Sequence, residues 1–244
     1  RGLGDVYKRQ VVLRDGKNVG SMKTSDASEK KIARLMVGSE TQKVSSKRIK
    51  PGGPILSLNE ISVAGQSKRD SLDDVNLILN SNEILGIAGI SGNGQNVLAD
   101  LISGLVAPDR GSIVLKGVAI ENISPFNMIK SGFGRIPEDR HRQGIVGGLS
   151  VSENMIIERL DDPQIQNFGF LRSSVIHKNA KTLSEKYDVR GPGIDQASRL
   201  LSGGNIQKLI LARVFEKQPE IVLANQPTRG LDTVSYTHLR AHET

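Results

Sequence analysis

The chain has 244 residues, a formal net charge of +7 and no cysteine, which excludes a disulfide framework and a zinc site built from thiolates. No apolar run approaches the roughly 18 residues that a helix needs to cross a bilayer, so the sequence predicts no transmembrane helix. The length allows one good hydrophobic core, or one domain together with the edge of another.

The two ends of the chain are predicted to come from a DNA adaptor. Codons can be chosen for residues 1–10 whose reverse complement, read one frame over, encodes Val234–His242. Unrelated protein termini have no reason to be related in this way, whereas one adaptor ligated to both ends of a DNA fragment produces the relation. We therefore interpret residues 1–10 and 233–244 as adaptor-derived, with Thr233 as a junction codon, and leave them out of the fold prediction.

Without these tails the net charge falls to +5, because the first tail holds three basic residues and one acidic residue and the second holds one of each. The sequence contains only one run of basic residues, Lys43–Lys50, and it has no interleaved aromatic residue. Such a run is most simply a solvated linker, so nucleic-acid binding is a minor hypothesis.

Residues 11–41 are predicted to be the tail of a preceding domain. Val11–Gly20 reads as two short strands around Asp15-Gly16, which is a hairpin signal, and Ser28–Val37 has apolar residues at helical spacing. Residues 42–54 are polar and end in a Pro/Gly-rich stretch, which is typical of a linker between domains. A new domain is expected to begin near Ile55.

From Ile55 onward, stretches with strand character alternate with helical ones, which predicts an α/β layered domain. Ser150 and Glu153 have the spacing of a capping box for the helix that follows them. The expected strands are Ile55–Val63, Glu83–Gly89, Ser112–Lys116 and Ile221–Ala224. The expected helices are Gln95–Leu105, Ser152–Arg159, Val175–Tyr187 and Ile206–Glu216.

A glycine-rich loop stands between the strand expected at 83–89 and the helix that follows it. Glycines allow positive φ and close backbone approach, so that successive amides can surround a phosphate. Compared with G-x-x-x-x-G-K-[ST], Gln95 replaces the lysine and Asn96 replaces the hydroxyl residue. A lost charge-assisted bond of about 1.5–3 kcal/mol weakens binding roughly tenfold to a hundredfold. From this loop alone, a phosphate-binding site and an ordinary glycine turn are equally plausible interpretations. Its candidate nucleotide-binding residues are Gly89, Ser91, Gly92, Asn93, Gly94, Gln95 and Asn96.

The segment Leu201–Lys208 combines a helix cap with two glycines. Ser202 can cap the helix while the amides of Gly203 and Gly204 point out of its positive end, where a γ-phosphate is favoured. The alternative is a capped loop without a ligand. The wording LSGGNIQK closely resembles the signature of the ATP-binding-cassette (ABC) family, and in that resemblance Gln207 joins the nucleotide-binding residues.

Two further segments carry the resemblance. Glu220–Asp232 is similar to the family's Walker B strand and D-loop, and Gly134–Arg140 stands at its Q-loop, with Glu138 in the glutamine position. Over roughly Ile55–Asp232 the chain resembles the second cassette of importers for simple sugars and nucleosides, on the strength of four short motifs: PEDR, GNGQ, LSGGN and QPTRGLD. The resemblance implies a P-loop NTPase fold: a RecA-like α/β core plus a helical signature subdomain, incomplete at its C-terminus.

The resemblance also exposes departures. The Walker B acidic pair, which binds Mg²⁺ and polarises water in active cassettes, is here Asn225 and Gln226. With Gln95, three charge-bearing positions are neutral, and phosphoryl transfer depends chiefly on electrostatics. We therefore expect this half's own nucleotide pocket not to hydrolyse ATP, and no metal at Asn225. No aromatic residue stands in Leu56–Val63 to stack on adenine.

The family arrangement implies a head-to-tail pair of cassettes in one polypeptide. Ser202, Gly203 and Gly204 would complete, in trans, a hydrolytic site for ATP and Mg²⁺ on the other cassette, and Asp232 would contribute to nucleotide binding. The partners implied are transmembrane permease subunits and, indirectly, a substrate-binding protein, with the subunit peripheral on the cytoplasmic face of the plasma membrane and no nucleic acid bound. Alternatives are a regulatory, non-hydrolysing nucleotide-binding module and a non-transport cassette acting on RNA or DNA.

The remaining polar residues favour simpler interpretations. His141 and His177 are isolated, so each is expected to be solvated or locally bonded. The charged loop from Glu138 to Arg142 is compatible both with local ion pairing and with coupling to a transmembrane partner. Tyr187 and Phe215 are expected in the core.

Overall fold

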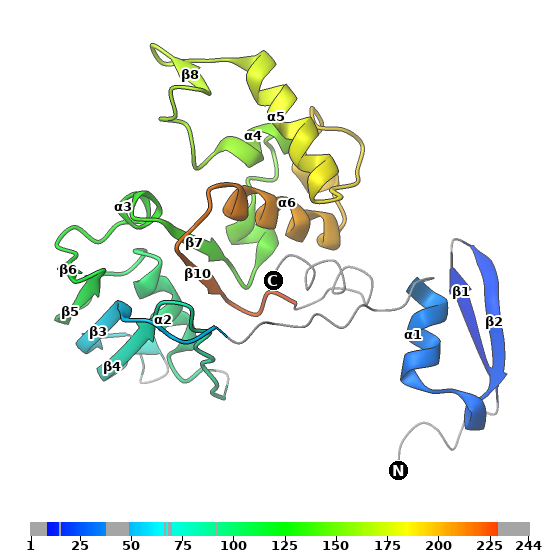
Figure 1. Ribbon diagram of the computed structural model, residues 1–244, viewed down its shortest axis with the longest axis horizontal. Helices are drawn as coiled ribbons and strands as arrows, with labels where there is room; N and C mark the ends of the chain where they lie inside the picture. The colour runs from blue at the N-terminus through cyan, green and yellow to red at the C-terminus, as the bar shows by residue number, and fades with distance from the viewer. Residues whose placement is uncertain are drawn as a thin grey trace. The chain divides into compact units, whose positions relative to one another are not determined.

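The computed structural model describes residues 9–14, 16–37, 49–65, 67, 70–90 and 92–228 (Figure 1). They divide into two compact units, residues 9–37 and residues 49–227. Of the residues predicted to be adaptor-derived, 1–8 and 233–244 lie outside the described residues, whereas Arg9 and Gln10 lie in a described strand. Most of the basic run 43–50 is also outside the described residues.

The first unit is a hairpin covered by a helix. Strands β1 (Arg9–Arg14) and β2 (Lys17–Lys23) pair antiparallel, and Gly16 takes the positive φ of +72° that the turn between them requires. After a 3₁₀ turn, η2 (Thr24–Asp26), helix α1 (Glu29–Val37) follows. A Cβ at Gly20 would stand 2.7 Å from Leu35 Cδ1, so the glycine lets the helix approach the hairpin. The predicted hairpin and helix are confirmed.

The second unit contains two main sheets. The first is antiparallel in the order β4-β3-β5-β6, and the second pairs β7 with β10 in parallel. Their strands are β3 (Pro54–Val63), β4 (Leu72–Asn80), β5 (Arg110–Leu115), β6 (Val118–Ala119), β7 (Phe133–Ile136) and β10 (Ile221–Ala224).

The helices of this unit divide into two groups (Figure 1). Helix α2 packs on the sheets, whereas α4, α5 and α6 pack together and, with the segments that connect them, form what we call the helical group. Ser150 and Glu153 form the predicted capping box at the start of α4. The helices are α2 (Gln95–Ile102), α3 (Pro125–Lys130), the π-helix η4 (Arg140–Gly144), α4 (Val151–Ile156), α5 (Ser173–Lys186), the 3₁₀ turn η5 (Ser198–Leu200) and α6 (Gly203–Glu216). Among the described residues no helix combines the length and apolarity needed to cross a membrane.

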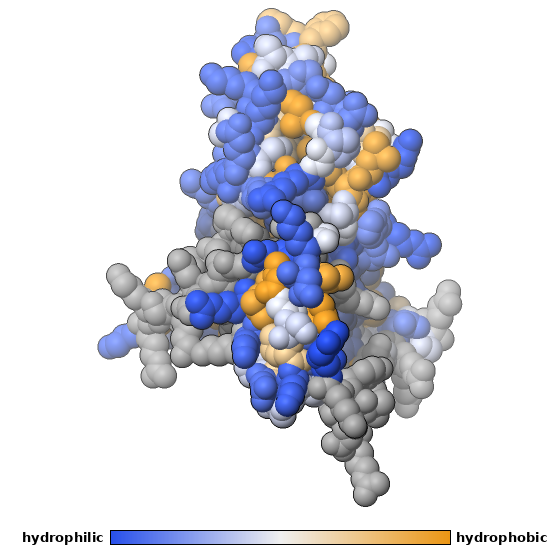
Figure 2. All heavy atoms as spheres, turned by 90° about the vertical axis from the view of Figure 1, so that its right-hand side faces the viewer, coloured by the Kyte–Doolittle hydropathy of each residue, from blue (hydrophilic) through white to orange (hydrophobic). Residues whose placement is uncertain are grey.

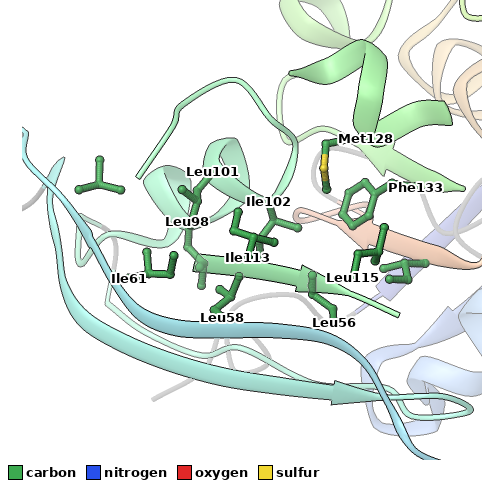
Figure 3. Packing of buried hydrophobic residues seen from close by; sticks show 12 residues of the cluster. Leu56, Leu58, Ile61, Leu98, Leu101, Ile102, Ile113, Leu115, Met128 and Phe133 are labelled. Atoms are coloured by element: carbon green, nitrogen blue, oxygen red, sulfur yellow. The ribbon is translucent and has the colours of Figure 1, made fainter. Parts of the chain in front are cut away.

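The main core lies between α2 and the two sheets (Figure 3). Leu98, Leu101 and Ile102 on one face of α2 meet Leu58 and Ile113 of the antiparallel sheet. Burying a side chain of this size contributes about 1.5–3 kcal/mol. The same cluster includes Phe133 of β7 and Ile221 of β10, so α2 packs beside both sheets.

The strand predicted at 83–89 is wrong. Within the described ranges no strand pairs with this segment, and its apolar side chains face solvent: Ile84 is 98 % exposed and Ile87 51 %. A strand requires a neighbour to take its backbone hydrogen bonds, and apolar sequence alone does not supply one. The structure also contains β4, β7 and α3, which the sequence did not predict.

The helical group ends in a small hairpin, β8 (Gln166–Asn167) and β9 (Phe170–Leu171). Phe168 and Phe170 are 93 % and 80 % exposed there, and Figure 2 shows apolar atoms at that tip. Below the hairpin, Ile156, Ile165 and Ile176 form a separate buried cluster, so the group has its own packing.

Buried polar contacts add to the rigidity of the helical group. The side-chain amide of fully buried Asn154 donates to the carbonyls of Val146 and Ser150 and to Ser198 Oγ. Each bond measures 3.0 Å. The turn η5 that precedes α6 is therefore tied to α4.

Candidate functional site

The glycine-rich loop leads directly into α2. Gly92 and Gly94 have φ values of +88° and +85°, and Gly94 is the N-cap of α2 without a side-chain bond. A Cβ at Gly94 would stand 3.0 Å from the Ser71 carbonyl oxygen, so both conformation and space favour glycine. Ser91 lies outside the described residues.

The side chain of Gln95 folds back over this loop. Its Nε2 donates to the carbonyl of Ile90 at 2.9 Å, and its Oε1 accepts from the backbone N–H of Asn93 at 3.0 Å. Nε2 also stands 2.2 Å from the position of a Cβ on Gly89. One of the amides that a phosphate would need is therefore already bonded within the loop.

The Walker B and Q-loop positions meet at one sheet edge. Parallel strands β7 and β10 end their register at Ile136 and Ala224, and the N–H of Asn225 donates to the Ile136 carbonyl at 2.9 Å. Glu138 and Gln226 both follow these carboxyl ends, and Gln226 has a positive φ of +45°.

A partly buried ion pair ties this edge to the loop's helix. Arg135 Nη2 on β7 bonds Asp100 Oδ1 on α2 at 2.9 Å, and both side chains are partly shielded from solvent. The structure thus holds the loop's helix against β7, the strand that leads into the predicted Q-loop position.

The predicted Walker B position lacks the charge that would hold a magnesium ion. Asn225 and Gln226 are amides, whereas Mg²⁺ in proteins is usually held by one or two carboxylates together with substrate phosphates and waters. The described ranges hold no group of three or more His, Cys, Asp or Glu side chains suited to a metal. Asp232 lies outside the described residues.

The signature residues form the start of α6. Ser202 is the N-cap, with its Oγ accepting from the Asn205 N–H at 3.4 Å and from Asn205 Nδ2 at 2.9 Å. Asn205 Oδ1 accepts in turn from the N–H of Arg190 at 2.8 Å. Gly203 and Gly204 occupy the first turn of a 14-residue helix, where free N–H groups and the helix dipole favour an anion.

The PEDR loop contacts this signature. The Arg140 guanidinium occupies the space beside Gly203, with Nη2 2.9 Å from where a Cβ would stand. Asp139 accepts from the N–H groups of Arg142 and His141, each at 3.0 Å. These hydrogen bonds hold the pKa of the exposed Asp139 carboxyl below its ordinary value, and the bond from the Arg142 N–H has the larger effect. The loop thus has local contacts of its own.

The other predicted residues have different surroundings. Gln207 is 2 % exposed in α6, and its Nε2 has no hydrogen-bond partner in the part of the chain that the structure describes. His177 pairs locally with Asp195 at 3.1 Å, whereas His141 is exposed. Tyr187 is buried as predicted, and Phe215 is only half-buried.

Arg213 is the residue that the sequence interpretation missed. It is 6 % exposed in the last turn of α6, and burial lowers the pKa of its guanidinium while Glu158 raises it. A single arginine inside the apolar run from Leu209 to Phe215 is the signal that could have identified it.

A family model described as "ABC transporter" matches residues 72–229. Among curated proteins, a guanosine import ATP-binding protein of Bacillus subtilis is 35 % identical over 98 % of this chain and 47 % of its own length. A glucose import ATP-binding protein of Haloferax volcanii is 39 % identical over 96 % of this chain and 43 % of its own. A nucleoside import ATP-binding protein of Lactococcus lactis is 35 % identical over 96 % and 47 %. The chain spans about half the length of these relatives.

Solved structures agree on the fold. A dimeric ATP-binding cassette in a post-hydrolysis state, bound to ADP and Pi, gives a TM-score of 0.62 at 21 % identity, covering 78 % of this chain and 81 % of that one. A second dimeric structure of the same cassette gives 0.63 at 19 % identity, with the same coverage. The predicted α/β cassette fold is confirmed.

Proposed function

The chain belongs to the ABC transporter family, and we propose that it is part of the ATP-binding, energy-coupling subunit of an importer for simple sugars or nucleosides. The relatives above are named for import of guanosine, glucose and nucleosides, which supports that substrate class. The observation that carries the proposal is the contrast between an ordered signature, Ser202 to Gly204, and a phosphate loop closed by Gln95.

In this proposal the chain is one half of a two-cassette subunit. Residues 11–41 close the preceding cassette, residues 42–54 link it to the next, and residues 55–232 form the second cassette. The separation of the described residues into two compact units supports this division. The relatives' greater length supports the presence of another cassette in the same polypeptide.

The second cassette donates its signature to the ATP held by the first. Ser202, Gly203 and Gly204 bring the positive end of α6 to the γ-phosphate, and ATP with Mg²⁺ is the substrate of that composite site. An anion at a helix N-terminus is favoured by about 0.3–1 kcal/mol at exposed positions and about 2 kcal/mol when partly buried. Water exclusion on closure places the interaction toward the upper value.

The second cassette's own pocket does not hydrolyse ATP. Gln95 satisfies the loop internally, and Asn225 and Gln226 supply neither the metal-binding charge nor the general base. The chain is therefore an ATPase only together with the other half. Closure of the pair, favoured by ATP, would drive the membrane partner by a shift in population.

The partners proposed are transmembrane permease subunits and, through them, a substrate-binding protein. The subunit is then peripheral on the cytoplasmic face of the plasma membrane and binds no nucleic acid. Glu138, in the Q-loop position at the sheet edge, is the proposed point of coupling to the permease.

The test is ATP hydrolysis by the complete two-cassette subunit carrying Gly204→Asp, with Gly204→Asn as the neutral control of matching shape. An acidic residue in the first turn favours the helix, so lost turnover reports repulsion of phosphate rather than unfolding. Gly203 is less suitable, because a Cβ there would meet Arg140. We expect Gly204→Asp to abolish turnover and Gly204→Asn to retain most of it. Unchanged turnover in Gly204→Asp would contradict the composite site and favour a regulatory, non-hydrolysing module.

A further inference from the structure

The π-helix η4 contacts α6 at both of its ends. At the first end the Arg140 guanidinium lies against Gly203, as described above. At the second, a Cβ on Gly144 would stand 2.4 Å from Ile210 Cδ1, so the backbone of η4 rests directly on α6. Short π-helices are uncommon and recur at functional positions.

Arg213 fixes the second end. Its Nη2 donates to the Gly144 carbonyl at 2.8 Å, its Nη1 reaches the Asn154 carbonyl at 3.4 Å, and its Nε stands 3.0 Å from Glu158 Oε1. One buried guanidinium thus joins η4, α4 and the residues after α4 to the last turn of α6. Glu158 is the carboxylate that offsets this buried charge, and a buried ion pair that loses one partner leaves an uncompensated charge behind.

The two contacts on α6 are far apart along the helix. Gly203 and Arg213 are ten residues apart, about 15 Å along the axis. Two such contacts fix both the distance and the orientation of η4 relative to α6, which a single contact cannot do.

The position of η4 in the chain gives this attachment a role. Strand β7 ends at Ile136, and only the Pro137-Glu138-Asp139 segment separates it from η4. The chain therefore runs from the sheet edge, through the Q-loop position, into the element held by Arg213. Asp139 alone separates Glu138 from Arg140, the first residue of η4, whose guanidinium lies against Gly203 of α6.

We propose that Arg213 is a positioning residue that fixes the segment Asp139–Gly144 to α6, so that displacement of the Glu138 loop moves the signature at Ser202 with it. The inference rests on the proposed function, because it assigns the loop to the permease and the signature to ATP. It adds the residue that transmits one to the other. Without this bond the Gly144 end of η4 loses its polar attachment to α6, and we expect that end to move more freely.

The variants compare Arg213 with a neighbouring cation. Arg213→Met removes the bond to Gly144 while keeping an unbranched side chain. Lys217→Met is the matched control. Lys217 Nζ donates to the Glu158 carbonyl at 3.2 Å and lies 3.8 Å from Glu158 Oε2, and within the described part of the chain it forms no hydrogen bond or ion pair with η4. Should Arg213→Met fail to fold, the double variant with Glu158→Gln removes the stranded carboxylate as well.

The measurement is the ratio of permease-stimulated to basal ATP hydrolysis by the complete subunit, together with amide hydrogen exchange in residues 139–144 and 203–206. We expect Arg213→Met to lower the ratio at least fivefold and to speed exchange in both segments, and Lys217→Met to resemble the wild type. An unchanged ratio and unchanged exchange in Arg213→Met would overturn the inference, as would equal effects in Lys217→Met. If the wild type itself shows no stimulation by a permease, the proposed function fails, while hydrogen exchange still decides whether Arg213 holds η4.

Discussion

Replacing Gln95 tests whether this side chain competes with phosphate in its own loop. A phosphate must take the Asn93 amide from Gln95 Oε1 and displace Nε2 from the Ile90 carbonyl. A neutral hydrogen bond contributes a net of about 0.5–1.5 kcal/mol, so the two together oppose binding by about 1–3 kcal/mol. Gln95→Ala removes this competition, and Gln95→Lys also adds a charge-assisted bond of about 1.5–3 kcal/mol.

The lower values apply because the loop is largely exposed. At 1.4 kcal/mol per decade, Gln95→Ala should tighten binding about fivefold and Gln95→Lys about sixtyfold. The assay is photolabelling of the complete subunit with an azido-ATP, followed by cleavage in the linker, so that half-saturation is read for this half alone. Gln164→Lys, in an exposed position of the helical group, controls for added charge.

The order Lys, Ala, Gln in decreasing affinity is the diagnostic result. Equal half-saturation for all three would refute the idea that Gln95 closes the loop. A gain in Gln95→Lys without one in Gln95→Ala would show that a missing cation, and not an internal bond, weakens the site.

Two further predictions concern stability, both measured by urea unfolding. Gly134→Ala should lower the free energy of unfolding by about 1–3 kcal/mol, because the new Cβ would stand 2.6 Å from Val214 Cγ1. Gly148 has open space around it, so Gly148→Ala should change the free energy of unfolding by less than about 0.5 kcal/mol. Equal effects of the two substitutions would contradict the packing argument. Bonds from the Ser150 N–H and hydroxyl lower the pKa of the Glu153 carboxyl below its ordinary value of 4.5. A carboxyl whose pKa is lower in the folded state than in the unfolded state stabilises the fold at pH values above its unfolded-state pKa, and this stabilisation disappears as the pH falls through its folded-state pKa. Glu153→Gln should therefore lower the free energy of unfolding at pH 7 and leave it nearly unchanged in strong acid. A difference between the two proteins that does not depend on pH would refute this assignment.

Sequence predicted the elements whose signals are local. The strand Ile221–Ala224 and the helix over 206–216 were found because short-range apolar patterns and a capping serine define them without reference to partners. The segment 83–89 has an equally apolar pattern and is not a strand, since pairing depends on a neighbour distant in sequence. Strand β7 has the sequence Phe-Gly-Arg-Ile, in which a glycine and an arginine interrupt the apolar pattern that β10 shows over the same length.

The candidate site divides in the same way. Motif order predicts the phosphate loop, the signature and the Walker B position, because each has a characteristic local sequence. The fold-back of Gln95 and the pairing of Arg213 with Gly144 join side chains to backbone groups, and a motif specifies neither the rotamer nor, for Arg213, the partner 69 residues away. Such contacts require coordinates.

The open segment after β4 has a practical consequence for anyone purifying these residues by themselves. Ile84, Ile87 and Ile90 are all more than half exposed, on backbone that no described strand protects. Unprotected apolar segments of this kind associate with copies of themselves. The soluble fraction of a protein limited to these residues should therefore fall with increasing concentration and rise again in mild detergent. Ile84→Lys should improve its solubility, and it lies outside both predicted nucleotide-binding motifs.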